Sequence, residues 1–424
     1  MISKVRTMLG NKDTSQLLKN FFSLAVLKLV NAVLPFVTLP YLIKVLGIQQ
    51  YGAIVLALSL MAYFQAVTDY GFNLSATREI ARHRANKRQL SFIYSKTIIT
   101  KMYLLLSSLA VLVPIILLVP QFREDLLVYL LMCLMLIGQT LFPEWFFRGV
   151  ERMGYITALN LIVKLSFTIG VFILIKAPQD YWLYPFLLGV SYIIVAFISH
   201  YIIMRKFNLK LIFVGIKRVK KTLKIGFPLF VNQFVPTLFN NTTNFLVGMI
   251  LGKASAGYFG ATRQVVQILT VFNSVVSGVA FPYLIRYKEK FGVFSKYYLI
   301  LISAISLFLV LVHQYIFDII GIKYNFDSEV FYILIAGFLA IVFYSVYSTN
   351  YLISRGYDKL VMRITIIASI IGFVLSFPLI YKFGLLGGAT NIFISQLILG
   401  FGSYFYFKKI NKEMKYENQK VCKK

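Results

Sequence analysis

Apolar runs of about 20 residues recur along the whole chain, and short polar segments separate them. A helix of that length crosses a hydrocarbon core of roughly 30 Å. The first run is too long, and too polar at its exit, for a cleaved signal peptide. The pattern therefore predicts an all-α integral membrane protein of about twelve transmembrane helices. The predicted spans are 18–43, 51–73, 97–119, 125–148, 156–177, 181–204, 223–249, 257–282, 296–321, 329–353, 361–382 and 385–407.

Composition and charge agree with this class. The 424 residues are 59% hydrophobic and 14% charged, whereas soluble proteins carry about a quarter charged residues. The net charge is +29, and about 34 of the 44 Lys and Arg lie on the side of the predicted spans that holds both termini. Basic residues stay cytoplasmic during insertion, so both termini are predicted in the cytoplasm. The basic segments then face anionic membrane lipids, and nucleic acid is not expected as a partner.

The sequence contains a weak internal repeat at an offset near 206. Three short matches occur in the same order in the two halves of the chain. They pair Leu46-Gly47 with Leu251-Gly252, Arg148-Gly149 with Arg355-Gly356, and Lys176 with Lys382. Each half holds six predicted spans, so the halves share one orientation in the membrane. We predict two six-helix lobes around a central cavity, 1–210 and 211–424, the second ending in a short basic tail.

Four cations lie inside predicted spans, where a charge at mid-bilayer costs about 2.5–3.5 kcal/mol. Lys28 and Lys164 lie deepest along their helices. Lys101 and Arg263 lie only about five residues from a boundary, so their side chains can extend to the headgroups. Depth alone ranks functional interest as Lys28, Lys164, Arg263, Lys101.

Helical spacing arranges polar residues in stripes around these cations. Asn31 follows Lys28 at i+3, and Gln267 follows Arg263 at i+4, while the seventh span is the most polar of all. Such stripes favour a water-filled cavity, although Ser, Thr, Asn and Gln also link membrane helices structurally. The predicted substrate-binding residues are Lys28, Asn31, Lys164, Asn240, Asn244, Arg263 and Gln267.

Two acidic residues in the spans are candidates for ion coupling. Asp69 has no obvious local partner, whereas Glu144 lies four residues before Arg148 and has an ordinary i, i+4 ion pair as its alternative. The sequence shows no phosphate-binding loop, Asp-x-Asp pair or metal-ligand cluster. We therefore expect a transporter rather than an enzyme, with no catalytic residues, cofactor or metal.

Three motifs resemble Wzx-type O-antigen flippases of the multidrug/oligosaccharidyl-lipid/polysaccharide exporter superfamily. They are Leu34-Pro35 through Tyr51-Gly52, Asp69-Tyr70-Gly71 through Arg78, and Trp145-Phe146-Phe147-Arg148-Gly149 through Met153. Family members more often carry Gln at the position of Arg148. The specific likeness ends near residue 160; beyond it the likeness lies mainly in length, span number and loop pattern.

This resemblance implies a flippase in the bacterial inner membrane. Its substrate would be an oligosaccharide repeat unit on undecaprenyl pyrophosphate, carried from the inner to the outer leaflet by alternating access. A polysaccharide polymerase and a chain-length regulator are the implied protein partners.

Two alternatives remain open. One is a drug or cation antiporter of the same superfamily, which should prefer acidic cavity residues. The other is a scaffold of polysaccharide assembly that transports nothing, for which charge substitutions in the spans would be neutral.

Overall fold

The computed structural model describes the backbone of residues 12–322 and 328–421. It describes the side chains of 26–322 and 328–413, except 29, 32, 239 and 240. The regular secondary structure of these ranges is helical, which confirms the predicted all-α class. The chain divides into two compact units, of which the first ends at Thr237 and the second begins at Leu238. This division falls within a helix, later than the predicted boundary at 210.

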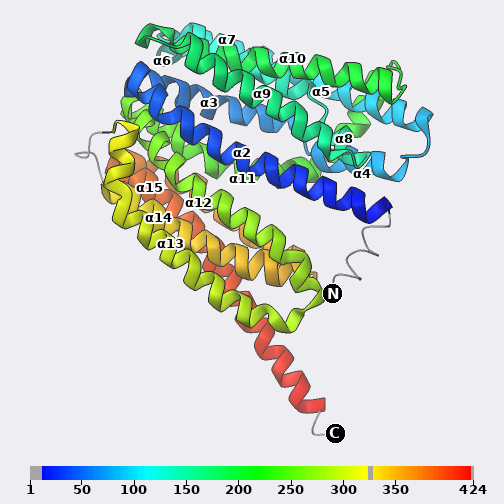
Figure 1. Ribbon diagram of the computed structural model, residues 1–424, viewed down its shortest axis with the longest axis vertical. Helices are drawn as coiled ribbons and strands as arrows, with labels where there is room; N and C mark the ends of the chain where they lie inside the picture. Colours follow the sequence, from blue (N-terminus) through cyan, green and yellow to red (C-terminus); the bar gives the residue numbers. More distant parts are fainter. Residues whose placement is uncertain (1–11, 323–327, 422–424) are drawn as a thin grey trace. The chain divides into compact units, whose positions relative to one another are not determined.

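Unit 1 is a bundle of long helices joined by short ones (Figure 1). Helix α7 contacts α10, α5 and α3, and α9 packs against both α2 and α10. The elements are α2 (Lys12–Leu46), α3 (Ile48–Asp69), α4 (Phe72–Arg82), α5 (Lys87–Leu118), α6 (Pro120–Arg123), α7 (Leu126–Leu141), α8 (Glu144–Gly149), α9 (Met153–Leu174), η1 (Pro178–Trp182), α10 (Leu183–Lys206) and the first part of α11 (Ile216–Leu251).

Unit 2 begins with the rest of α11. Helix α15 packs along α14 and η3, and α12 also contacts η3, a π-helical segment. The elements are α12 (Lys253–Arg286), η2 (Lys288–Lys290), α13 (Phe291–Ile320), α14 (Ser328–Phe343), η3 (Tyr344–Leu352), η4 (Ile353–Arg355) and α15 (Asp358–Val421). Gly384, with φ 59° and ψ −132°, breaks the helical path of α15 between the last two predicted spans.

Ten helices in the described ranges are long and apolar enough to cross a membrane. Every predicted span overlaps helix. The ten do not include α11, which holds the polar seventh span, and they count α15 once, although Gly384 separates two predicted spans within it. The number of twelve crossings stays a prediction.

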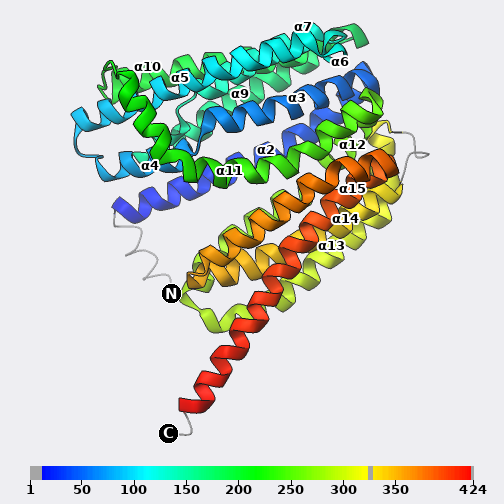
Figure 2. The same ribbon diagram turned by 180° about the vertical axis from the view of Figure 1, so that it is seen from behind.

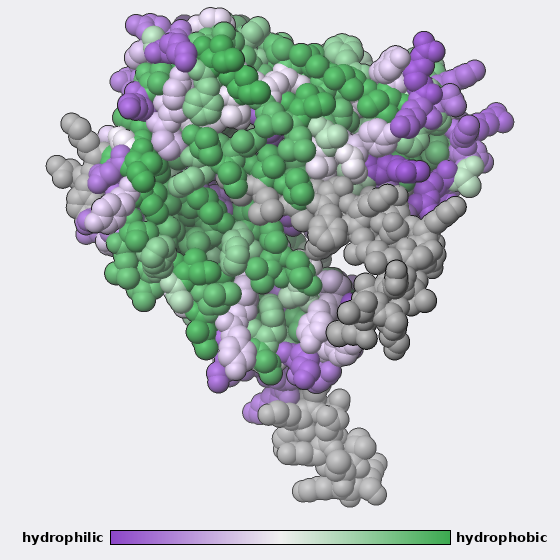
Figure 3. Space-filling model, viewed as in Figure 1, coloured by the Kyte–Doolittle hydropathy of each residue, from purple (hydrophilic) through white to green (hydrophobic). Residues whose placement is uncertain are grey.

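Large apolar side chains cover the sides of many helices (Figure 3). Leu118, Phe197, Leu311 and Tyr315 are each about 70% exposed. Apolar surface of this extent marks contact with a membrane or another protein. Hydrophilic residues lie mainly toward the helix ends in the same view, as the water-facing borders of a membrane protein require.

The predicted repeat has a backbone counterpart. Gly47 precedes α3 with φ 81° and ψ 163°, and Gly252 precedes α12 with φ 88° and ψ 173°. Only glycine adopts this conformation at no steric cost. The same unusual turn therefore begins a long helix at matching places in the two halves.

Glycines bring α7 and α10 unusually close in unit 1. A Cβ added to Gly138 would lie 2.6 Å from the Cβ of Tyr192, and one added to Gly189 would lie 2.7 Å from the Cβ of Leu134. Since packed helix backbones cannot move apart without losing other contacts, this approach fixes how the two helices meet.

We expect Gly138→Ala to destabilise unit 1 by about 1–3 kcal/mol, because the added methyl group overpacks the α7–α10 interface. The apparent unfolding midpoint of the detergent-purified protein should fall by roughly 2–10 °C at a fixed scan rate. Gly154→Ala on α9 is the matched control, since a Cβ there meets nothing within 4 Å. Equal midpoints for both variants would contradict the tight approach.

Candidate functional site

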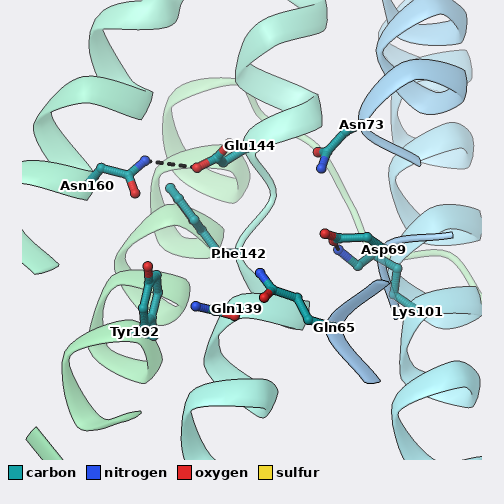
Figure 4. A pocket seen from close by; sticks show the side chains of 9 residues that line it. All are labelled: Gln65, Asp69, Asn73, Lys101, Gln139, Phe142, Glu144, Asn160 and Tyr192. Atoms are coloured by element: carbon teal, nitrogen blue, oxygen red, sulfur yellow. Dashed lines mark hydrogen bonds and ion pairs between the residues drawn. The ribbon is translucent and has the colours of Figure 1, made fainter. Parts of the chain in front are cut away.

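A polar pocket of about 140 Å³ lies inside unit 1 (Figure 4). Seven helices and the α7–α8 connection each contribute at least one side chain. The lining residues are Gln65 and Asp69 of α3, Asn73 of α4, Lys101 of α5, Gln139 of α7, Phe142, Glu144 of α8, Asn160 of α9 and Tyr192 of α10. Charged and amide side chains gathered between membrane-type helices are expensive, so this pocket is a candidate functional site.

The motif that begins at Asp69 forms one wall of the pocket. Helix α3 ends there because Tyr70 (φ 41°) and Gly71 (φ 74°) are both left-handed, and α4 then starts in a new direction. The Tyr70 ring stacks on Phe230 of α11 at 4.6 Å, and its hydroxyl donates to the Leu223 carbonyl at 3.2 Å. Figure 2 shows the first part of α11 beside this turn. The left-handed turn separates Asp69 and Asn73 while keeping both on the pocket.

The segment that leads into the motif beginning at Trp145 forms another wall, through Phe142 and Glu144. The chain turns at Pro143 and enters α8, which packs on α4. Gly149 lies so close to Ile80 that an added Cβ would be 2.6 Å from it. The Thr77 hydroxyl donates to the Trp145 carbonyl at 3.1 Å. Two of the three motifs that carry the family resemblance therefore pack on each other. Asp69 and Asn73 of the first line the pocket, and so does Glu144, which directly precedes the second.

Lys101 lies in the interior instead of extending to the headgroups. Its side chain is 2% exposed, and its Nζ lies 3.1 Å from Oδ1 of Asp69. The low rank that depth gave to Lys101 was thus misleading. The ranking counted its distance from the end of its own helix and took no account of a partner on a neighbouring helix. Asp69, which has no local partner in sequence, has this one in space.

Glu144 has partners on two sides. It accepts a hydrogen bond from Nδ2 of Asn160 at 2.9 Å, and its second oxygen lies 3.6 Å from Arg148. The i, i+4 ion pair with Arg148 is confirmed. Asn160 is 7% exposed and belongs to the same polar stripe as Lys164. The carboxylate of Glu144 is therefore oriented by α8 and α9 together.

Gln139 presents an unused acceptor. Its Oε1 is buried and has no hydrogen-bond partner among the described residues. In Figure 4 the amide lies between Tyr192 and Gln65. A buried amide oxygen without a donor costs about 1–3 kcal/mol, unless water or a ligand supplies one.

The pocket lining carries two carboxylates and one ammonium, plus four amides. The described residues contain no group of three His, Cys, Asp or Glu that could hold a metal ion. What the pocket offers is a dense set of hydrogen-bond donors and acceptors with a slight excess of negative charge. Such a set suits a polyhydroxylated ligand or a small cation, and it is unfavourable for a pyrophosphate dianion.

The predicted substrate-binding residues lie elsewhere. Lys28 and Asn31 are exposed on α2, and Lys164 is half-buried on α9, which packs against α2. In unit 2, Asn244 and Arg263 are half-buried and Gln267 is exposed, while the side chain of Asn240 lies outside the described residues. Of the predicted residues whose side chains are described, the ion-coupling candidates Asp69 and Glu144 line the pocket and the others do not. The binding and coupling roles stay predictions.

Seven lining residues were not among the predicted site residues. They are Gln65, Asn73, Lys101, Gln139, Phe142, Asn160 and Tyr192. Amides inside apolar spans were the available signal for Gln65 and Gln139, but the same signal marks amides that only link helices. Asn73 lies within a resemblance motif and could have been found there.

The helical architecture, the ten membrane-crossing candidates and the exposed apolar sides define a multi-pass membrane protein. Residues 17–288 match the polysaccharide biosynthesis protein family, and the chain belongs to this family. The resemblance stated from the motifs is thereby confirmed. The prediction of a transporter rather than an enzyme is confirmed as well.

Curated relatives extend over nearly the whole chain. The "Putative O-antigen transporter" of Escherichia coli (strain K12) is 25% identical over 399 residues, which are 92% of this chain and 96% of that protein. A protein of the same name from Shigella dysenteriae is 26% identical over 389 residues, 90% of this chain and 97% of that one.

Solved structures share the fold at low sequence identity. An inward-facing multidrug transporter of the MATE family has a TM-score of 0.71 at 13% identity, covering 92% of this chain and 99% of that chain. The lipid II flippase MurJ in an inward closed conformation has a TM-score of 0.64 at 17% identity, and the match covers 91% of this chain and 87% of that chain. Their likeness supports the predicted two-lobed fold.

We expect Lys101 and Asp69 to show strong energetic coupling. Lys101→Met alone leaves a carboxylate that is only 28% exposed without its cation, whereas the double variant with Asp69→Asn removes both charges. The double-mutant cycle should give about 1–3 kcal/mol, measured from unfolding midpoints of the purified protein.

The matched control is the surface pair Arg84 and Glu151, whose side chains are 50% and 52% exposed. Its cycle, with Arg84→Met and Glu151→Gln, should stay below about 1 kcal/mol. Additive effects for Lys101 and Asp69 would show that their contact stabilises nothing.

Proposed function

We propose that the protein is a flippase for lipid-linked polysaccharide repeat units. The observation that carries the proposal is a polar pocket within a multi-pass fold, lined by Asp69 and Asn73 of one family motif and by Glu144, which leads into another motif packed on the first. Family membership and the curated relatives named for O-antigen transport support the cargo class. The fold neighbours include both a drug transporter and a lipid II flippase, so the fold alone does not select the cargo.

The proposed cargo is an oligosaccharide on undecaprenyl pyrophosphate in the bacterial inner membrane, with both chain termini in the cytoplasm. Lys28, Lys164 and Arg263 are the proposed ligands for its pyrophosphate or acidic sugars, since a cation donates charge-assisted hydrogen bonds to such groups. Asn31, Asn240, Asn244 and Gln267 supply neutral contacts in the same proposal. Alternating access by rocking of the two halves carries the cargo across. A polymerase and a chain-length regulator receive it.

Ion coupling is the proposed energy source, through Asp69 and Glu144. Lys101 already neutralises Asp69 at 3.1 Å, whereas Glu144 contacts an amide and a half-exposed Arg148. Protonating Asp69 would leave a buried ammonium without its counter-charge, which is costly. Glu144 is therefore the better of the two for gaining and losing a cation during transport.

The cargo proposal is tested by surface polysaccharide in a strain that lacks the gene. We expect wild type to restore the polysaccharide, and Lys28→Ala, Lys164→Ala and Arg263→Ala each to lower its synthesis about tenfold at equal expression, since a lost charged hydrogen bond is worth roughly 1.5–3 kcal/mol. Lys28→Arg should retain function. Lys44→Ala, an exposed lysine on the same helix, is the control. Full complementation by all three Ala variants would remove these residues from the site.

The coupling proposal is tested with proteoliposomes and a fluorescent lipid-linked oligosaccharide. Wild-type flipping should accelerate under an imposed proton or sodium gradient, and Glu144→Gln should abolish this acceleration while a basal rate persists. The substitution keeps the side-chain shape and removes the charge. Wild-type flipping that responds to neither gradient nor to membrane potential would rule the coupling out.

A further inference from the structure

We propose that the pocket inside unit 1 binds one uncharged sugar ring of the transported cargo. The inference rests on the proposed function for the origin of the sugar, but the pocket and its chemistry stand on their own geometry. It assigns a role to residues outside the predicted substrate-binding set.

The size of the pocket selects a single ring. Its volume of about 140 Å³ is several times the roughly 30 Å³ that one water occupies, so one ion or water does not fill it. It is also well below the roughly 300–1,000 Å³ of sites that enclose drug-sized molecules. The pocket is partly open, so one unit of an oligosaccharide can enter it while the rest of the chain stays outside.

The charges of the pocket exclude the anionic part of the cargo. Lys101, the cation of the lining, lies 3.1 Å from the Asp69 carboxylate. Glu144 adds a second carboxylate to the wall. Glu144 is itself paired with Arg148 at 3.6 Å. A pyrophosphate or a uronic acid would have to compete with Asp69 for Lys101 and with Glu144 for Arg148. A neutral polyol meets no such barrier.

The hydrogen-bonding groups match what sugar hydroxyls need. Each hydroxyl donates one hydrogen bond and accepts others, and an amide side chain does both. Four amides line the pocket, namely Gln65, Asn73, Gln139 and Asn160. The Oε1 of Gln139 is buried and has no donor among the described residues, so a rotation of this amide toward the pocket would let it accept from a hydroxyl. A sugar hydroxyl at this place would relieve the cost of that orphan atom.

Two aromatic side chains complete the lining. Phe142 and Tyr192 lie on the same side of the pocket as Gln139 and Asn160 in Figure 4. The face of an aromatic ring is negative, so it attracts the slightly positive C–H bonds on the flat side of a sugar. The amides can thus contact the hydroxyls at the edge of one sugar ring, and the aromatic side chains can contact its face.

The test uses the full-length protein in nanodiscs and methyl glycosides of neutral hexoses and N-acetylhexosamines as probes. Saturation-transfer NMR should detect their binding to wild type. Gln139→Ala should weaken it about fivefold, the loss expected from one hydrogen bond. Gln121→Ala, at an exposed glutamine of α6, should leave it unchanged. Asn73→Ala, at the half-buried start of α4, is the second variant if Gln139→Ala does not fold.

Each outcome decides the proposal. Absence of a wild-type signal, or a signal that neither pocket variant weakens, overturns it. A pocket that binds sodium or a proton in a Glu144-dependent way, with no sugar signal, is a cation site only. Preferential binding of methyl glucuronide also overturns it, because it shows an anion site. The proteoliposome assay separates the two proposals: sugar binding without flipping leaves the subsite and removes the flippase, and flipping without sugar binding does the reverse.

Discussion

A polar side chain inside a bilayer has to find its partner within the protein, because the hydrocarbon supplies no hydrogen bonds. The contact between Lys101 and Asp69 is the clearest case in unit 1. Lys101 is 2% exposed, and its ammonium is tolerated there because the carboxylate lies 3.1 Å away. This one contact links α5 to the end of α3, where the chain turns into α4. The position of the pocket therefore depends on it.

The turn after Asp69 shows how the sequence builds around that contact. Two left-handed residues in succession are costly unless the surroundings hold them. Gly71 avoids the cost, and Tyr70 is held by its stack on Phe230 and its bond to the Leu223 carbonyl. On the other side, Trp145, Phe146 and Phe147 are fully buried and anchor α8 against α4. The aromatic residues of the motifs are structural, and the polar residues beside them form the pocket.

The helices were predictable from the sequence, because each is an apolar run whose length suits a membrane. The pair of Glu144 with Arg148 was predictable as well, since it is local. The buried position of Lys101 was not predictable, because its depth along α5 says nothing about which side chain of a neighbouring helix it contacts. Gln139 was not, because its unused acceptor depends on α10 approaching α7 at Gly138. Asp69, the first residue of one motif, and Glu144, directly before another, came within reach of prediction because the resemblance marks segments that pack together.

The two halves share a backbone frame without sharing this pocket. Gly47 and Gly252 begin α3 and α12 with the same unusual turn, so the repeat of about 206 residues reflects a common architecture. At that offset Lys101 corresponds to Leu307, whose side chain is 60% exposed on α13. Asp69 corresponds to Val275, an apolar residue of α12. Unit 2 instead buries a neutral network in which Asn273 bonds Ser345 and Asn350 bonds Ser277 around the π-helical segment η3. The side chains of this network are uncharged, so the contact between Lys101 and Asp69 has no counterpart at the matching positions of unit 2.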